Sequence, residues 1–199
     1  MANKKRVLIA LITDQMIHHK VVGTLCQILL ANTNYKIDTY VSAMRGIGEH
    51  RNVVVKEFLK GDYDYLLFID ADNPPPVNVL DLIEEDKPVI GLPTPIQMSA
   101  IQGLEEFYWN VYDNDYPRKN KGDGLEQVYM VGSGVMLIRR DVLESLENPF
   151  TEVRDETGLR IVGTDMAFCK KCKEQNIDIY THWDYKCSHF KEINLLNII

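Results

Sequence analysis

Hydrophobic residues in the first half of the chain follow two alternating patterns. Short continuous apolar runs are typical of buried strands, whereas apolar residues spaced three and four apart are typical of amphipathic helices. The apolar runs predict strands over residues 5–13, 35–42, 65–69 and 87–95. The helical spacing predicts helices over residues 18–31, 50–60 and 77–85. Strands that alternate with helices predict βαβ units and a mainly parallel sheet with helices on both faces.

The second half of the chain has a less regular pattern. An aromatic-rich alternating stretch and a turn rich in Gly, Asn and Asp, over residues 97–124, predict a hairpin or an active-site flap. Residues 129–147 predict a turn, a short strand and a helix, and residues 163–176 predict a helix capped by Thr164. Residues 177–183 predict a late strand. We find no internal repeat and therefore expect a single domain.

The composition is typical of a soluble globular protein, with 45% hydrophobic and 26% charged residues in 199. The net charge of -7 argues against binding to nucleic acid, which requires Lys and Arg to neutralise phosphates. A phosphorylated ligand would therefore need local positive charge or a metal. The apolar run near the N-terminus, about seven residues long, is too short to span a membrane. We predict a cytoplasmic protein with no integral membrane segment.

Two acids follow the third predicted strand. Asp70 and Asp72 come directly after the buried run, and the prolines at 74–76 end the strand there. The turn allows both carboxylates to reach one point, where Mg²⁺ or Mn²⁺ would favour oxygen ligands from carboxylates and a diphosphate. Alternatively, the two acids only end the strand and start a turn, as Asp often does.

Four stretches occur in the order found in one enzyme family. They are "DYDYLLFIDADN", "VGSGVMLIRRDVLE", "GTDMAFCKKCKEQNIDIY" and "CSHF". In order and spacing the chain resembles GT-A-type glycosyltransferases over residues 5–191, especially small family-two-like members from bacteria or encoded by viruses.

The resemblance implies an α/β fold, a GT-A (Rossmann-like) domain with a mostly parallel central sheet flanked by helices. Residues 1–95 would form the nucleotide-sugar-binding half, and residues 96–199 the acceptor-binding and catalytic half. The implied reaction is metal-dependent transfer of a sugar from a UDP- or GDP-sugar donor to a hydroxyl group of a glycan, protein or small-molecule acceptor.

The resemblance also implies a metal site and a base. Asp70, Asp72 and His189 match the residues that bind Mn²⁺ or Mg²⁺, and the metal in turn holds the donor diphosphate. By position, Asp70 would lie nearer the donor ribose or the metal, and Asp72 would be the firmer metal ligand. Asp165 matches the acid that takes the proton from the acceptor hydroxyl in inverting members. Taken alone, His189 could be a surface or hydrogen-bonded core histidine, and Asp165 could be an acid that complements a helix dipole.

The remaining matches concern the donor. Thr13 and Asp14 lie where family members contact the base and ribose, although "LITDQMIHHK" lacks the usual proline of that opening, so the base stays undetermined. The loop residues Gly132, Ser133 and Gly134 match a loop beside the donor sugar, or else form a plain turn. The candidate cations for the diphosphate, each of which could instead be a solvated surface charge, are Arg45, Arg51 and Lys191.

Two other functions remain open at this point. Cys169, Cys172, Cys187 and His189 could hold a structural zinc in an interaction module, although the predicted helix would pack the first two as small hydrophobic side chains. A phosphohydrolase or phosphotransferase could use Asp70 as nucleophile and Asp72 as acid and base. Pro74 stands where that class usually has Thr or Val, which argues against the second alternative. The cysteines, Cys26 included, form no secreted disulfide framework, and we expect reduced thiols and no bound zinc.

Overall fold

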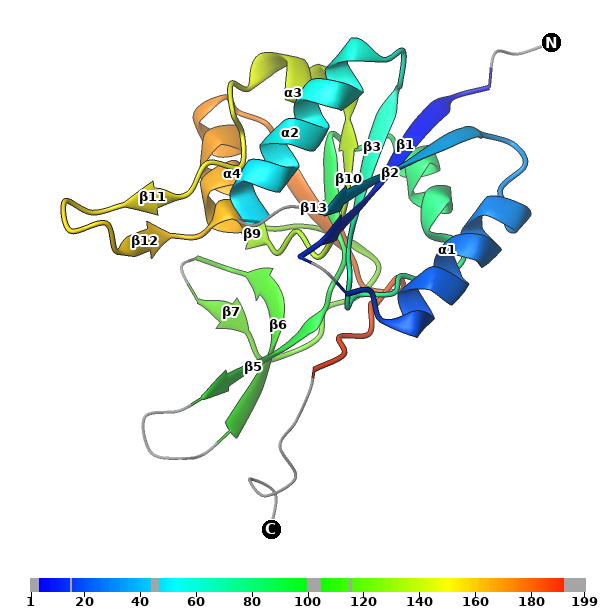
Figure 1. Cartoon of the computed structure of the whole chain (residues 1–199). Coiled ribbons are helices and arrows are strands. Elements are labelled where there is room, and N and C mark those ends of the chain that lie inside the picture. Colours follow the sequence, from blue (N-terminus) through cyan, green and yellow to red (C-terminus); the bar gives the residue numbers. More distant parts are fainter. Residues whose placement is uncertain (1–3, 15, 44–46, 100–104, 115, 192–199) are drawn as a thin grey trace.

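The computed structural model describes residues 4–14, 16–43, 47–99, 105–114 and 116–191 (Figure 1). A seven-stranded sheet forms the centre, in the order β2-β1-β3-β10-β4-β13-β8. Its strands are β1 (Arg6–Thr13), β2 (Lys36–Ala43), β3 (Tyr65–Asp70), β4 (Val89–Gly91), β8 (Leu125–Gln127), β10 (Val135–Arg139) and β13 (Ile179–His182). The helices are α1 (His19–Ala31), α2 (Ile47–Lys60), η1 (Val79–Glu85), α3 (Arg140–Ser145) and α4 (Thr164–Glu174).

The central sheet is mixed rather than mainly parallel as the sequence predicts, because three of its six strand pairs are parallel and three are antiparallel. Strand β1 pairs in parallel with both β2 and β3, and β13 pairs in parallel with β4. Strand β10 lies antiparallel between β3 and β4, and β8 is antiparallel to β13 at the edge. The carboxyl ends of β1 and β3 therefore lie side by side at the edge of the sheet where ligands bind in open α/β folds.

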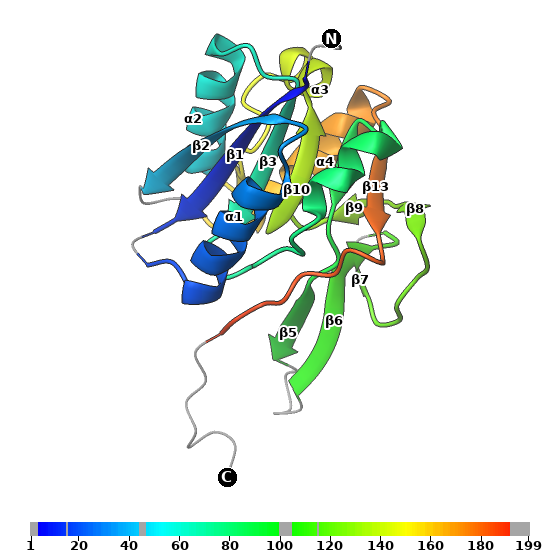
Figure 2. The ribbon, with the colours of Figure 1, turned by 90° about the vertical axis from the view of Figure 1, so that its right-hand side faces the viewer.

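Helices cover both faces of the sheet (Figure 2). Each face has its own apolar cluster. On one face, Val54 and Phe58 of α2, Val142 of α3 and Phe168 of α4 pack with side chains of the sheet. On the other face, α1 and η1 bury aliphatic residues against the alternate side chains of the same strands. Successive side chains of β1 and β3 are buried on alternate faces of the sheet. Because both faces are covered, the sequences of these strands are continuous apolar runs.

A smaller sheet and a separate hairpin come from the second half of the chain. Strands β5 (Pro95–Ser99), β6 (Glu105–Tyr112), β7 (Pro117–Arg118) and β9 (Met130–Val131) form the smaller sheet. This confirms the hairpin predicted over residues 97–124. Strands β11 (Val153–Arg154) and β12 (Arg160–Val162) form the hairpin, which projects beside α4 in Figure 1.

Several predicted boundaries differ from the structure. The segment predicted as a helix over 77–85 is a 3₁₀ helix that ends at Glu85. The next residue, Asp86, has a left-handed backbone conformation with φ 47°. Strand β4 is shorter than predicted, because Pro88, Pro93 and Pro95 have no N–H group to donate to a sheet. Thr164 does not cap α4: it is the first helical residue, after Gly163 at the cap position.

Strands from both predicted halves share the central sheet. Strands β8, β10 and β13 come from residues 96–199, and β10 lies between β3 and β4. The division of roles between residues 1–95 and 96–199 stays a prediction. Within the described residues, no helix is both long and apolar enough to cross a membrane.

Candidate functional site

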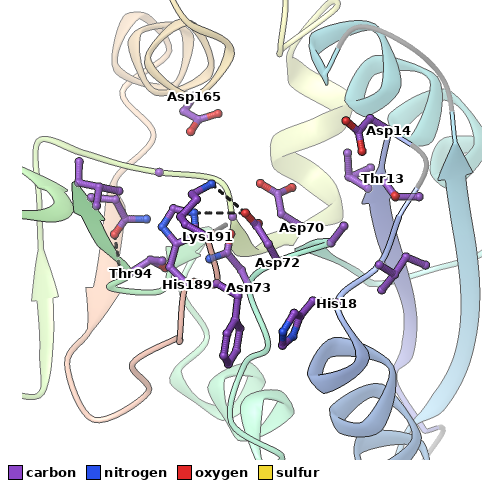
Figure 3. A pocket seen from close by; sticks show the side chains of 18 of the residues that line it. Thr13, Asp14, His18, Asp70, Asp72, Asn73, Thr94, Asp165, His189 and Lys191 are labelled. Atoms are coloured by element: carbon purple, nitrogen blue, oxygen red, sulfur yellow. Dashed lines mark hydrogen bonds and ion pairs between the residues drawn. The ribbon is translucent and has the colours of Figure 1, made fainter. Parts of the chain in front are cut away.

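A cleft of about 1090 Å³ lies at the carboxyl ends of β1 and β3. Besides Asp14, three acids line it: Asp70 at the end of β3, Asp72 two residues later and Asp165 in the first turn of α4. Figure 3 shows the three carboxylates turned toward the same space, with Thr13 and Asp14 across from Asp72. The predicted convergence of Asp70 with Asp72 is therefore present, and Asp165 joins them from a distant part of the chain.

Backbone hydrogen bonds hold the turn after β3 in place. The N–H of Asp70 donates to the carbonyl of Gly134 at 2.7 Å, and the N–H of Ala71 donates to the carbonyl of Ile12 at 3.0 Å. The side chain of Asn73 is buried and donates to the carbonyl of Ser188 at 3.1 Å. These bonds tie the two acids to β1, to the loop before β10 and to the C-terminal segment.

Arg51 is a buried cation at the centre of the site. Only 2% of its side chain is exposed, and its Nη2 donates to both oxygens of Asp70 at 2.7 and 3.0 Å. Its Nη1 lies 3.6 Å from Oδ1 of Asp165. The interpretation of Arg51 as a solvated surface charge is therefore wrong, because two carboxylates at the sheet edge hold it in the interior.

The pKa of Asp70 is raised to about 6. Burial is the main cause, because it disfavours the charged form, and the charges of Asp165 and Asp72 act in the same direction. The positive charge of Arg51 opposes the increase. Asp70 is thus the carboxylate in this site that protonates nearest to neutral pH.

Asp165 also lies beside Arg51, but its pKa is shifted in the opposite direction from that of Asp70. Burial raises its pKa, but the charge of Arg51 and hydrogen bonds from Ser133 and Thr164 outweigh this effect, so its pKa lies below the usual range. Oγ of Ser133 donates to Oδ1 at 2.5 Å, and the N–H of Ser133 donates to Oδ2 at 3.2 Å. Ser133 is fully buried, so its direct contact with a ligand stays a prediction.

Asp72 is held by the C-terminal segment. Nζ of Lys191 donates to Oδ2 of Asp72 at 2.8 Å, and Nε2 of His189 lies 3.4 Å from the same oxygen (Figure 3). Burial opposes ionisation, but hydrogen bonds from His189 and Lys191 lower the pKa of Asp72 to about 2. The sequence predictions for His189 and Lys191 thus fall on two side chains that both contact Asp72.

The ring of His189 lies between Asp72 and the backbone carbonyl of Pro95. Nδ1 of His189 lies 2.8 Å from the carbonyl oxygen of Pro95, and since a carbonyl only accepts, Nδ1 carries the proton. Nε2 faces Oδ2 of Asp72, where it donates to the carboxylate when it carries a proton and can bind a cation when it does not. Within the described part of the chain no group of three or more His, Cys, Asp or Glu side chains forms a metal site. A cation would therefore need oxygen atoms from a ligand such as a diphosphate.

The loop before β10 requires glycine at two positions. A Cβ at Gly132 would lie 2.6 Å from Nδ2 of Asn110, and one at Gly134 would lie 2.6 Å from Oδ1 of Asn73. Both glycines line the cleft. Gly132 thus lets the loop approach β6 closely, and Gly134 lets it approach the turn after β3, whereas the close approach of this loop to a ligand stays a prediction.

The other residues predicted to contact the donor are Thr13, Asp14 and Arg45. Thr13 is buried at the end of β1, and its Oγ1 donates to the carbonyl of Met16 at 2.8 Å. Asp14 is exposed and, like Thr13, lines the cleft. Arg45 lies outside the described residues. The structure thus brings both residues after β1 to the same cleft as the acids.

Sequence reasoning missed several residues of the cleft. His50 of α2, Tyr112 of β6 and Phe190 all line it. The ring of Phe190 stacks on that of His18, with centroids 3.9 Å apart. No sequence pattern indicates these residues, because they come from three different segments and only the fold brings them together.

A second cleft, of about 890 Å³, adjoins the first. The two share Asp70, Tyr112 and Asp165, so they meet at these residues. Arg51 of α2 and Arg154 of the β11–β12 hairpin line the second cleft only. Asp165 can therefore contact ligands in either cleft.

The cysteines do not form the zinc site considered as an alternative. Cys169 and Cys172 belong to the apolar cluster on one face of the sheet, whereas Cys187 belongs to the cluster on the other face. Burial raises the pKa of the Cys169 thiol to about 12, which disfavours the thiolate that binds zinc. These thiols are part of the core, as the i, i+3 spacing predicts.

No protein-family model and no curated protein matches the chain. Solved structures do match: A197 from STIV has a TM-score of 0.62 and 21% identity, over 94% of this chain and 86% of that one. UDP-glucose pyrophosphorylase complexed with UDP-glucose has a TM-score of 0.54 and 10% identity, over 97% and 95%. The apo form of a UDP-glucose pyrophosphorylase has a TM-score of 0.51 and 9% identity, over 92% and 91%. At these identities the similarity establishes the fold, which this chain shares with those proteins.

Proposed function

We propose that the protein is a metal-dependent glycosyltransferase of the GT-A type, which transfers a sugar from a nucleoside-diphosphate sugar to an acceptor hydroxyl. The observation that carries the proposal is the meeting of Asp70, Asp72 and Asp165 in one cleft at the carboxyl ends of the parallel strands β1 and β3. The shared fold with a protein solved in complex with UDP-glucose supports a nucleotide-sugar donor. Fold alone does not define the reaction, so the proposal depends on the three acids.

The first cleft would bind the donor. Asp72, His189 and Asp70 would hold Mn²⁺ or Mg²⁺, which when bound neutralises charge on the diphosphate leaving group. Lys191 is 54% exposed, so its side chain can turn from Asp72 toward a phosphate oxygen. Thr13 and Asp14 would border the nucleoside, and Gly132 and Gly134 would leave room for the sugar.

Asp165 would act as the base for the acceptor hydroxyl. Its lowered pKa keeps it ionised at neutral pH, and Ser133 fixes the orientation of its carboxylate. Because Asp165 borders both clefts, an acceptor in the second cleft could place its hydroxyl between Asp165 and a donor in the first. A base within hydrogen-bond reach of that hydroxyl is the geometry that such a transfer requires.

Calorimetry with UDP and GDP, with and without Mn²⁺, tests the donor site. We expect Mn²⁺ to increase the affinity for at least one nucleotide, and Asp72→Ala to remove that increase. Asp62→Ala is the matched control, because Asp62 is 97% exposed, lines neither cleft and precedes the first residue of β3, whereas Asp70 is at the other end of that strand. Equal affinity in Mn²⁺ and in EDTA would exclude the metal from donor binding.

A screen of nucleotide sugars for hydrolysis or transfer tests the reaction. Release of free sugar or of a glycosylated acceptor together with a nucleoside diphosphate is the expected outcome. Release of phosphate from simple phosphate esters would instead support the phosphohydrolase or phosphotransferase alternative, with Asp70 as nucleophile.

A further inference from the structure

Among the described residues, the buried side-chain nitrogens without a hydrogen-bond partner belong to two consecutive residues. They are Nδ1 and Nε2 of His50 and Nε of Arg51. His50 is 1% exposed, and it lines the first cleft. Buried polar groups are nearly always paired, so two such residues in sequence at one cleft indicate a place where a ligand supplies the partner.

The direction of His50 follows from its neighbours on α2. Successive residues of a helix point about 100° apart. Asn52 accepts from the N–H of Phe150 at 2.9 Å, and Arg51 contacts Asp70, so these two side chains face the second cleft. His50 lies about 200° around the helix from Asn52, on nearly the opposite side, and lines the first cleft only. Helix α2 packs against β1, whose last residue, Thr13, lines the same cleft.

We propose that His50 hydrogen-bonds the nucleoside part of the nucleotide ligand, an inference that rests on the proposed function. A neutral imidazole offers one donor and one acceptor, which suits the hydroxyl and carbonyl groups of a ribose or base. The diphosphate, in contrast, carries negative charge, and Lys191 and the metal-binding acids lie on the Asp72 side of the cleft. His50 and Thr13 would thus form the nucleoside end of the donor site.

His50→Leu tests this role, because leucine has a similar size and no polar atom. Without ligand, we expect a Tm about 2–4 °C higher than that of the native protein, since the variant buries no unpaired nitrogen. Its affinity for UDP or GDP, whichever the native protein binds, should fall about tenfold. Its affinity for inorganic pyrophosphate, which lacks a nucleoside, should stay unchanged. His50→Gln keeps a donor and an acceptor and should recover part of the nucleotide affinity.

His182→Leu is the matched control. His182 is also buried, but its Nδ1 accepts from the N–H of Asp184 at 3.4 Å and it lines neither cleft. This variant should have a lower Tm than the native protein and an unchanged nucleotide affinity. Both results are the opposite of those expected for His50→Leu.

Four results would overturn the inference. A lower Tm for ligand-free His50→Leu would mean that His50 has a partner within the protein. Unchanged nucleotide affinity in both His50 variants would remove His50 from the site while the proposed function stands, and an equal loss of pyrophosphate affinity would assign His50 to the diphosphate. If the native protein binds neither UDP nor GDP, the proposed function itself fails, and this inference with it.

Discussion

At the scale of single residues, the site is a charge arrangement around Arg51. One buried guanidinium faces Asp70 and Asp165, while Lys191 faces Asp72. The sequence could predict the acids, because Asp70 and Asp72 follow an obvious buried strand and Asp165 follows a recognisable "GTD" stretch. It could not predict the depth of Arg51, because helix periodicity gives the direction of a side chain but not what covers it.

The raised pKa of Asp70 predicts a pH dependence of stability. Its folded pKa of about 6 lies above the unfolded value of 3.8, so the folded protein binds the proton more tightly. The stability that this proton contributes is fully present below pH 3.8 and is lost as the pH rises through 6. The loss approaches ~3 kcal/mol, at ~1.4 kcal/mol per pH unit between the two pKa values.

Urea denaturation of the native protein and Asp70→Asn in EDTA, between pH 4 and pH 7, measures this effect. The free energy of unfolding of the native protein should fall relative to that of the variant across this range. Asp72 and Asp165, with lowered pKa values, act in the opposite sense and below pH 4, where their charges are lost. Parallel curves for the two proteins would show that Asp70 has an ordinary pKa.

At the scale of elements, long periodic segments were predictable and short ones were not. Helices α1 and α4 and strands β1 and β3 agree with the sequence prediction to within a few residues. Strands β8, β11 and β12 have two or three residues each, too few to show alternation. The β11–β12 hairpin matters for the site because Arg154 and Arg160 line the second cleft, yet nothing in the local pattern marks it.

The packing of α4 predicts which thiols react. Cys169 and Cys172 are fully buried on this helix and Cys187 is 4% exposed, whereas Cys26 on α1 is exposed. A thiol reagent should therefore modify Cys26 rapidly in the folded protein and the other three only on unfolding. Titration in buffer and in urea, with Cys26→Ser as the control, measures this. Rapid reaction of Cys169 or Cys172 would mean that α4 detaches from the core.

At the scale of the whole molecule, the fold brings distant acids to one edge. Strand β10 lies beside β3, so the loop that precedes β10 places Ser133 and Gly134 next to the turn after β3. Ser133 then contacts Asp165 at the start of α4. The sequence could predict that each segment ends near the sheet edge, but the mutual positions of the acids depend on the insertion of antiparallel β10, which periodicity does not reveal.

Asp165→Asn tests whether this assembly transfers a sugar or only binds a nucleotide. The substitution keeps size and an acceptor oxygen for Ser133 but removes basicity. A positioned base contributes ~10²–10⁴ in rate, so transfer should fall by about that factor while nucleotide affinity stays nearly unchanged. The measurements are the transfer rate and nucleotide calorimetry on the same preparation. Ser133→Ala is the control, because it removes one hydrogen bond to Asp165 and keeps the acid, so its rate should fall less.

Each other outcome assigns Asp165 a different role. Parallel loss of nucleotide binding and of rate would mean that Asp165 holds the donor, together with Arg51 at 3.6 Å. Full activity would contradict the assignment of the base, and would point to a retaining reaction or to another acid, such as Asp155 or Glu156 in the β11–β12 hairpin. Because Asp165 borders both clefts, its loss should affect reaction with an acceptor more strongly than slow hydrolysis of the donor by water. The ratio of these two rates therefore separates activation of an acceptor hydroxyl from general damage to the site.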